Sequence, residues 1–351
     1  MKRFLRLFLY LLIFVILLIG VFLAILTIQD YSPEAETFIY QSNDKSASIH
    51  YGQSYSILTW NIGYAGLGED MDFFYDGGSG VRTDPSAFER NLDNILVFMK
   101  VADTVDFFFA QEVDVAARRS FYVNEFDLIQ ENLNYANFIF AKNYDAPYVP
   151  VPPCSPMGKV VSGLMCMSKY KPFESVRYSY PDNYSWPKHL FLLDRCYLLN
   201  RYSLPNQKEL LLINTHNSAY DDGSLRQAQF NILLEVMLIE YKKGNYVIAG
   251  GDWNMNPPGF DESMISSADV TMTIRPLLDE ESIPKDWIVA YDPEVPTNRD
   301  LSLPYVKGTT ATTIIEYFIC SPNIEVIRIK TLNLGFENSD HNPVWMEFTF
   351  H

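Results

Sequence analysis

The segment NYVIAGGDWN, residues 245–254, predicts a central strand of the fold and gives the first indication of a site. It begins as an apolar run of strand length and ends in the sequence GGDWN. Glycines let the backbone turn sharply, while Asp252 and Asn254, two positions apart, project to the same side. The segment therefore predicts a buried strand that presents a carboxylate and a carboxamide at its C-terminal end. A simple Asx turn is the alternative interpretation.

Outward from this segment, apolar runs of strand length alternate with turn clusters and a few helical stretches. Strands are predicted at 54–62, 104–113, 135–142, 160–168, 190–202, 209–216, 245–253, 312–320, 324–334 and 343–350. Amphipathic helices are predicted at 86–101 and 224–241, and a third is expected after Asp114. The pattern indicates an α/β (α+β) domain built from two packed sheets with helices on their outer faces.

Composition excludes several classes of protein. The 351 residues are 48% hydrophobic and 20% charged, which rules out a disordered or collagen-like chain. The formal net charge of −16 disfavours a general nucleic-acid binder, because such proteins neutralise phosphates with Lys and Arg. The four cysteines have no CxxC spacing and are too few for a disulfide scaffold or a zinc cluster, so we expect core residues and at most one disulfide.

The N-terminus contains an apolar segment of membrane-spanning length. Residues 7–28 carry no charge and would measure about 33 Å as a helix, and the basic residues Lys2, Arg3 and Arg6 precede them. An uncleaved signal anchor is favoured over a cleaved signal peptide, with the N-terminus cytoplasmic and the remainder extracytoplasmic. The chain is thus expected to divide into a signal anchor, a polar linker and a single domain, at residues 1–29, 30–52 and 53–351.

Polar side chains also follow other predicted strands. Asn61 follows in LTWNIG, Glu112 in QEVD, and His216 in NTH, while Asp340 and His341 lie in SDHNPV just before the last strand. A carboxylate behind an apolar strand is costly to bury unless it is paired or binds a cation. Adjacent Asp and His can provide a metal-linked carboxylate and an imidazole that titrates near neutral pH. Each motif alone is also compatible with an ordinary turn or loop.

The ordered set TWNIG, QEVD, NTH, GDWN and SDHNPV resembles the endonuclease/exonuclease/phosphatase superfamily of metal-dependent phosphoesterases. The resemblance covers about residues 53–350 and rests on order, spacing and strand context together. It implies a four-layer sandwich of two mixed β-sheets flanked by helices, with a Mg²⁺-dependent site at one edge. It further implies that Glu112 is the principal metal ligand, assisted by Asn61 and Asp340, an oxygen-rich set that suits Mg²⁺ or Mn²⁺.

The same resemblance implies the catalytic roles. Asp252 would position and activate the attacking water, and Asn254 would hold the phosphoryl group in the transition state. His216 would donate to a phosphate oxygen, and His341 would act as acid/base or phosphate ligand. Glu316 departs from the pattern, because it stands where the family usually has an Asp that orients the last histidine. Its carboxylate is expected either to keep that contact with altered geometry or to be a paired core group.

Substrate choice is expected to depend on the loops between the motifs. The segments 64–84, aromatic and acidic, and 144–159, rich in proline, are predicted to form walls of the cleft. Arg195 and Arg226 are candidates for a phosphate or head-group contact, with surface ion pairs as the alternative. Further candidates to face the site are Asn298, Arg299 and Lys307, in the segment VPTNRDLSLPYVKG at 295–308.

Three functions follow from these observations. The first is an Mg²⁺-dependent phosphodiesterase or phosphatase that acts on a small or lipid phosphoester, for example with a sphingomyelinase-like activity. The second is an extracytoplasmic endo- or exonuclease, which the acidic charge disfavours. The third is a non-catalytic binding module on the same scaffold, which only the Glu316 departure favours. The expected partners are the phosphoester substrate and the membrane, and no protein partner is inferred.

Overall fold

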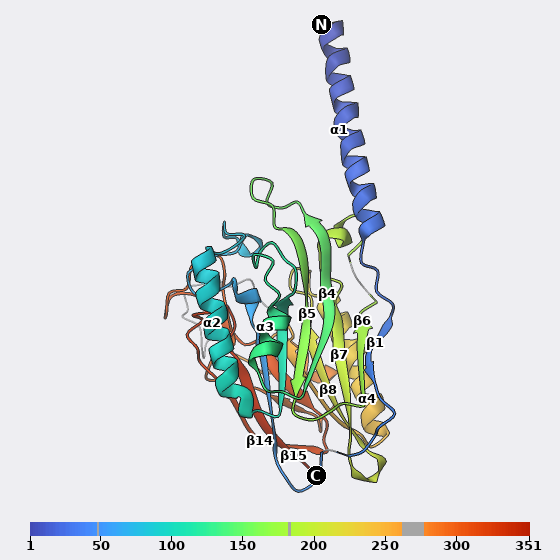
Figure 1. Cartoon of the computed structure of the whole chain (residues 1–351), viewed down its shortest axis with the longest axis vertical. Helices are drawn as coiled ribbons and strands as arrows, with labels where there is room; N and C mark the ends of the chain where they lie inside the picture. Colours follow the sequence, from blue (N-terminus) through green and yellow to red (C-terminus); the bar gives the residue numbers. More distant parts are fainter. Residues whose placement is uncertain (48, 182–183, 262–276) are drawn as a thin grey trace.

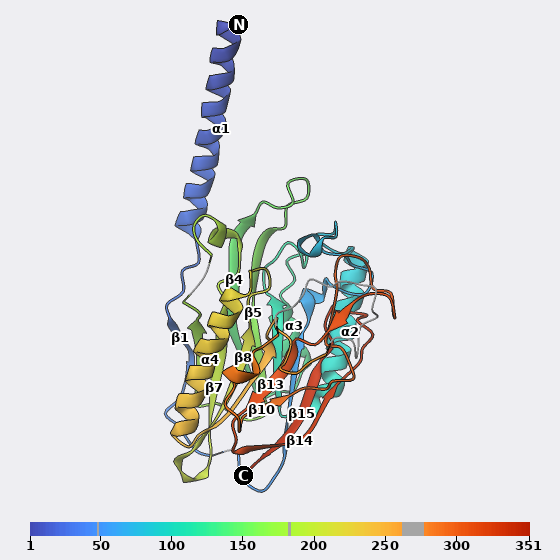
Figure 2. The same ribbon diagram turned by 180° about the vertical axis from the view of Figure 1, so that it is seen from behind.

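The computed structural model describes residues 1–47, 49–181, 184–261 and 277–351. Within them, two mixed β-sheets pack face to face and helices cover the outer face of each, as Figures 1 and 2 show. One sheet has seven strands, in the order β1 (Glu36–Gln41), β6 (Glu174–Ser179), β7 (Cys196–Ser203), β8 (Glu209–His216), β9 (Tyr246–Asp252), β13 (Glu316–Cys320) and β10 (Ile288–Ala290). The predicted four-layer architecture is confirmed.

The second sheet has six strands, in the order β14 (Ile324–Thr331), β15 (Val344–Phe350), β2 (Tyr55–Asn61), β3 (Phe107–Asp114), β5 (Gly158–Ser168) and β4 (Asn137–Val149). A small ribbon pairs β11 (Asn298–Arg299) with β12 (Thr312–Thr313). Each large sheet contains one parallel pair, β2 with β3 and β8 with β9, and its other strand pairs are antiparallel. The C-terminal ends of these parallel pairs lie at the same edge of the sandwich, as their side-chain contacts below show.

Successive side chains of each strand point to opposite faces of its sheet, and this alternation separates the inner core from the outer layers. Ile57 of β2 and Leu212 of β8 face the core between the sheets, whereas their neighbours Leu58 and Leu211 face outward. On the six-stranded sheet the outward residues pack against α2 (Pro85–Val101) and α3 (Glu125–Asn132). On the seven-stranded sheet they pack against α4 (Ser224–Lys242). The helices predicted at 86–101 and 224–241 are confirmed, and α3 is the third.

Several predicted boundaries were wrong. The strand predicted at 190–202 begins only at Cys196, because residues 188–191 form a 3₁₀ turn that leads the chain past the cleft. The strand predicted at 312–320 is interrupted between β12 and β13. The segment 30–52, expected as a linker, contains β1, which pairs with β6 at the sheet edge. Five of the six β1 residues are exposed, Phe38 and Ile39 among them, so its short apolar run does not mark a buried strand.

The N-terminal helix α1 (Lys2–Gln29) projects from the domain at the end opposite the C-terminus (Figures 1 and 2). Residues 2–28 have a mean hydropathy of 3.3 in their most apolar window, and among the described residues this is the one helix long and apolar enough to cross a membrane. Its side chains are exposed except near the domain, where Leu26 is buried. An exposed apolar helix of this length is a candidate membrane anchor or signal sequence.

Candidate active site

The predicted site residues of the two sheets meet at one edge of the sandwich. Asn61 ends β2, and its amide nitrogen donates to Asp252 Oδ2 at the end of β9, 3.1 Å away in the other sheet. His216 lies opposite Asp252 in the parallel β8–β9 register, and Glu316 lies opposite it in the antiparallel β9–β13 register. The topology thus brings together side chains that are far apart in the sequence.

Glu112 is held in the cleft by a local irregularity of β3. The pairing of β3 with β5 shifts register between Ala110 and Val113, and Glu112 has a φ of 56°, in the left-handed region. A non-glycine residue in that region costs about 1–3 kcal/mol and persists where the surrounding structure enforces it. Glu112 Oε1 accepts from the Asn61 amide at 3.2 Å and lies 4.0 Å from His216 Nε2. Burial raises the pKa of Glu112, which the nearby Arg119 partly offsets.

Asp252 is the centre of the arrangement. Its Oδ1 accepts from the backbone N–H of Asn254 at 3.0 Å, and its Oδ2 lies 3.5 Å from His216 Nε2. Asn254 itself has a φ of 52°, and its amide donates to the carbonyl of Asn217 at 3.0 Å. A Cβ at Gly251 would stand 2.0 Å from the carbonyl oxygen of Thr215, so only glycine allows β9 to approach β8 this closely.

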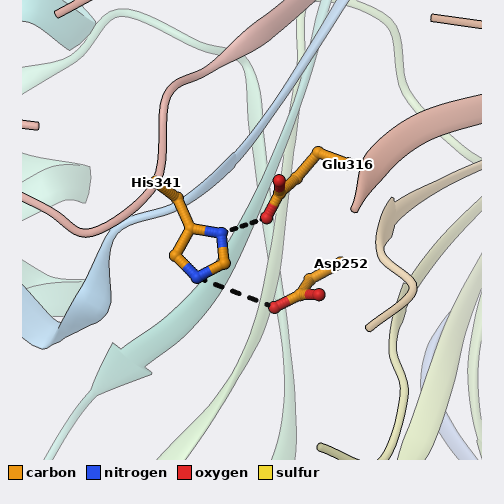
Figure 3. Close-up of side chains that lie close together, drawn as sticks. All are labelled: Asp252, Glu316 and His341. Carbon is orange, nitrogen blue, oxygen red and sulfur yellow. Dashed lines mark hydrogen bonds and ion pairs between the residues drawn. The ribbon is translucent and has the colours of Figure 1, made fainter. Parts of the chain in front are cut away.

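His341 lies between two carboxylates, as Figure 3 shows. Its Nδ1 hydrogen-bonds Glu316 Oε1, and its Nε2 is directed toward Asp252 Oδ2 at 4.0 Å. Burial disfavours the charged ring, but Glu316 and Asp340 outweigh this and raise the pKa of His341 well above its ordinary 6.5. Burial also raises the pKa of Glu316, to about 7, against the attraction of His341.

Asn61 and Asp340 complete the acidic side of the site. The side-chain oxygen Oδ1 of Asn61 accepts from the N–H of Gly63 at 3.0 Å, so the side-chain nitrogen Nδ2 is the atom that faces the carboxylates. Asp340 Oδ2 lies 3.4 Å from His341 Nε2. The second oxygen, Oδ1, is buried and has no hydrogen-bond partner among the described residues. A buried carboxylate oxygen without a donor is a suitable ligand for a cation.

A cavity of about 180 Å³ opens beside these residues. Seven of the ten residues predicted for the site line it: Glu112, Arg195, His216, Asp252, Asn254, Asp340 and His341. Asn61 and Glu316 lie directly behind them, in contact with Asp252 and His341. The predicted wall segments also contribute, through Tyr64, Phe73 and Tyr75 on one side and Tyr144 and Met157 on the other.

The two predicted arginines occupy different places. Arg195 is buried in the cavity wall, where it donates to the carbonyl oxygen of His216 at 3.2 Å, and burial lowers its pKa. Arg226 is outside the set of lining residues. It pairs with Asp221 at 2.8 Å and donates to the carbonyl oxygen of Asn254 at 3.1 Å, so it supports the backbone behind the site.

Sequence reasoning missed Arg119. Its guanidinium is buried, pairs with Asp114 at 2.9 Å, lies 3.9 Å from Glu112 and covers the ring of Tyr64 at 3.7 Å from its centre. It is therefore the cation closest to Glu112 among the described ion pairs, at the floor of the cavity. The available signal was the pair of arginines at 118–119, closely behind the QEVD motif; Arg118 instead binds the carbonyl of Pro156.

Among the described residues, one cluster of two carboxylates and an imidazole has its ligand atoms close enough together to hold a metal ion. Ligand atoms of Asp252, Glu316 and His341 lie within 4.8 Å of one another. This set differs from the one that the sequence suggested, Asn61, Glu112 and Asp340. The hydrogen bond between Glu316 and His341 already occupies two of its ligand atoms, whereas Glu112 and Asp340 present carboxylate oxygens to the cavity. We therefore favour Glu112 and Asp340 as the cation site. Asn61, predicted to assist them as a ligand, instead directs its amide nitrogen, a donor, toward the carboxylates.

Comparison with known proteins agrees with this geometry. The model described as the Endonuclease/Exonuclease/phosphatase family matches residues 58–341, well over half of the chain. The chain belongs to this family. A comparison with curated protein sequences found no match. The match includes all ten predicted site residues.

Solved structures share the fold at low sequence identity. An endonuclease/exonuclease/phosphatase from Beutenbergia cavernae DSM 12333 is 15% identical, with a TM-score of 0.53 over 85% of this chain and 72% of that one. Truncated Caenorhabditis elegans TDP2 is 15% identical, with a TM-score of 0.54 over 85% and 99%. ANGEL2, described as a 2′,3′-cyclic phosphatase, is 14% identical, with a TM-score of 0.54 over 91% and 99%.

Proposed function

We propose that this chain hydrolyses a phosphoester in a reaction that depends on Mg²⁺ or Mn²⁺, as a phosphodiesterase or phosphatase acting on a small or lipid substrate. The observation that carries the proposal is the convergence of Glu112, Asp252, His216 and His341 on one cavity. Carboxylates for a hard cation and imidazoles for proton transfer are the two components that attack of water on phosphorus needs. Family membership supports the same class of reaction.

The donor set fits a divalent cation. Glu112 and Asp340 would hold it, with Asn61 beside them, and the unpartnered Oδ1 of Asp340 supports this assignment. Burial has raised the pKa of Glu112, so this carboxylate lacks full compensation for its charge in the protein itself. When bound, the ion would polarise a phosphoryl oxygen and offset the negative charge of substrate and carboxylates.

The remaining residues would act on the water and the phosphoryl group. Asp252, fixed by Asn254 N–H and the Asn61 amide, would accept a proton from the attacking water. His216, next to it, would donate to a phosphoryl oxygen. His341, held by Glu316, would exchange a proton with the substrate from the opposite side. Asn254 would contribute its amide to the phosphoryl group in the transition state.

The alternatives have less support. The Glu316 carboxylate reaches His341, so the departure that favoured a non-catalytic module leaves the orienting contact in place. A nuclease is favoured by the fold neighbour D. rerio TDP2, described as complexed with a single-strand DNA product, at a TM-score of 0.51 and 15% identity. The net charge of −16 counts against a long polyanion as substrate. We also propose that α1 is a signal anchor and that the domain is extracytoplasmic. The basic residues before α1 support this orientation, because such residues mark the cytoplasmic side of a membrane span.

The test uses the full chain in detergent with bis-p-nitrophenyl phosphate as substrate. We expect turnover that EDTA abolishes and that Mg²⁺ or Mn²⁺ restores. Asp252→Asn should lower kcat by about 10²–10⁴-fold, because it removes the group that accepts the proton of water. Asp222→Asn, an exposed carboxylate outside the cavity lining, is the matched control and should retain full activity. Unchanged rates in EDTA, or normal turnover by Asp252→Asn, would contradict the proposal.

A further inference from the structure

The anchor helix is not free of the domain but packs against two of its segments. Phe22 meets Tyr148, at the end of β4, with ring centres 6.1 Å apart. Trp186 donates its indole N–H to Thr27 at 3.1 Å, and Leu26 is 4% exposed. One segment is the β4–β5 hairpin tip, residues 146–158, and the other is the turn at 184–193 that leads into β7.

Tyr148 of the hairpin tip contacts α1 within its apolar stretch and not beyond the end of it. Phe22 lies six positions before Ile28, the last apolar residue, which is about 9 Å along the helix. The head-group region of a bilayer is only about 5–7 Å deep on each side. If α1 crosses a bilayer, Tyr148 must therefore pass through the head-group region to reach Phe22.

The chemistry of the tip suits that position. Residues 146–158, APYVPVPPCSPMG, contain no charged residue, in a chain whose net charge is −16. Tyr148 and Val151 remain 37% and 36% exposed, and Trp186 is 57% exposed. Aromatic side chains with a polar end are enriched at membrane interfaces. The tip is thus an uncharged and partly aromatic surface on an otherwise acidic molecule.

The same segments line the catalytic cavity. Tyr144 of β4 and Met157 at the other arm of the hairpin belong to both the cavity wall and an apolar cluster that includes Val149 of the tip. Leu192 and Leu193, at the end of the 184–193 turn that contacts α1, line the cavity as well. Apolar side chains of one packed cluster therefore lie between the hairpin tip and the cavity wall.

We propose that the hairpin tip and the 184–193 turn rest in the interface of the bilayer that carries α1, and that the cavity receives the phosphoester head group of a lipid from that same leaflet. The second part rests on the proposed function. The apolar wall formed by Tyr144, Met157 and Leu193 contacts the glycerol or acyl region, while Arg119 and Arg195 face the phosphate. The occupant of this surface is the lipid bilayer itself.

The depth of the tip can be measured with a native thiol. Cys154 is exposed at the tip, whereas Cys166, Cys196 and Cys320 are at most 3% exposed, so a fluorescent maleimide will label Cys154 in the folded chain. In phosphatidylcholine vesicles with nitroxide-bearing lipids, we expect strong quenching of this label. The control is the same label on Glu325→Cys in a Cys154→Ser background, because Glu325 lies at the opposite end of β14 from the site. Equal and weak quenching at both positions would overturn the membrane contact.

The origin of the substrate is tested with the full chain in proteoliposomes. Sphingomyelin, phosphatidylglycerol and phosphatidylinositol are supplied in turn, either in the vesicles that hold the protein or in separate vesicles. We expect at least about tenfold faster hydrolysis of one of them in the shared vesicles, because tethering raises the effective concentration of the lipid. Equal rates from separate vesicles would overturn capture from the same leaflet.

A matched pair of variants separates the surface from the chemistry. Val151→Glu puts a charge on the tip and should lower lipid hydrolysis about tenfold or more while bis-p-nitrophenyl phosphate turnover stays unchanged. Val97→Glu, the same change on the exposed face of α2, should alter neither. If bis-p-nitrophenyl phosphate is hydrolysed but no lipid is, the proposal that the cavity receives a lipid head group is contradicted, while the proposed function stands. If neither is hydrolysed, the proposed function fails, and the quenching experiment still decides whether the tip contacts the membrane.

Discussion

At the scale of single residues, the site depends on side chains held in costly conformations. Glu112 and Asn254 both have φ above 50° without being glycine, and each directs a polar side chain toward Asp252 or the cavity. Strain of this kind is retained where the surrounding structure enforces it and function uses it. Glu316 adds a second cost, since it is fully buried and relies on His341 for its hydrogen bond. Three of the residues predicted to do the chemistry are therefore held by the fold in a conformation or an environment that is costly on its own.

Glu316 gives the most specific residue-level prediction. Glu316→Gln keeps the shape of the side chain but removes the charge that orients His341, so we expect kcat to fall by about 10–100-fold with little change in KM. Steady-state kinetics on a soluble diester measure both constants, and the melting temperature checks the fold. Glu347→Gln, a partly exposed carboxylate on β15, is the control and should change neither constant. A wild-type kcat for Glu316→Gln would mean that the pair is structural only.

At the scale of elements, α4 is fastened to the seven-stranded sheet by a charge cluster around the buried Glu240. Arg201 of β7 binds Glu240 of α4 at 2.9 Å, and Lys243 and Asn245 each donate to the same carboxylate at 2.8 Å. Burial alone would raise the pKa of Glu240, but these donors outweigh it and lower the pKa to about 2. Since α4 covers the strands that end in His216 and Asp252, the cluster also holds the support of the site.

This cluster predicts a pH dependence of stability. The pKa of Glu240 is lower in the folded state than its ordinary 4.5, so its stabilisation is complete above pH 4.5 and is lost as the pH falls toward 2. Glu240→Gln should cost about 1–3 kcal/mol of unfolding free energy at pH 7 and nothing near pH 2. Urea unfolding of the full chain, followed by tryptophan fluorescence, measures this. Glu235→Gln, exposed on the same helix, should leave the pH profile unchanged.

The same elements show what the sequence could and could not predict. Strands buried on both faces, such as β8 and β9, were located to within a residue, because an apolar run and its polar end mark their limits. The edge strand β1 was missed because backbone pairing with β6, not side-chain burial, holds it in place. Arg119 was missed because its role depends on contacts with Glu112 and Tyr64 that only the folded chain creates. Arg226 was expected at the phosphate but lies behind the cavity wall.

At the scale of the whole molecule, the negative charge lies almost entirely outside the apolar N-terminal helix. Apart from Lys2, Arg3 and Arg6, which precede the apolar helix, the chain has 24 basic and 43 acidic residues, a net charge of about −19. A bound cation can invert the field locally at Glu112 and Asp340 while the surrounding surface stays negative. The charge therefore limits the length of a phosphate-containing substrate more than it limits the reaction type.

Plasmid DNA gives the corresponding whole-molecule prediction. We expect nicking of plasmid by the full chain to be at least about tenfold slower than turnover of a small diester at 50 mM salt, because repulsion opposes a long polyanion. The rate on the small diester should change little between 50 and 200 mM salt, since one phosphate makes few long-range contacts. Efficient nicking that falls steeply with salt would instead favour the nuclease.

The hydrogen bond between Asn61 and Asp252 has a further consequence for the whole molecule. It joins the last residues of β2 and β9, which belong to different sheets, so the residues proposed to be catalytic are divided across the main packing interface. A slip of one sheet over the other by about 1 Å would separate the carboxylates from their partners while every strand kept its own hydrogen bonds. The catalytic rate should then respond strongly to small changes in the relative position of the two sheets. Core substitutions far from the edge should be detected by loss of turnover before any loss of secondary structure.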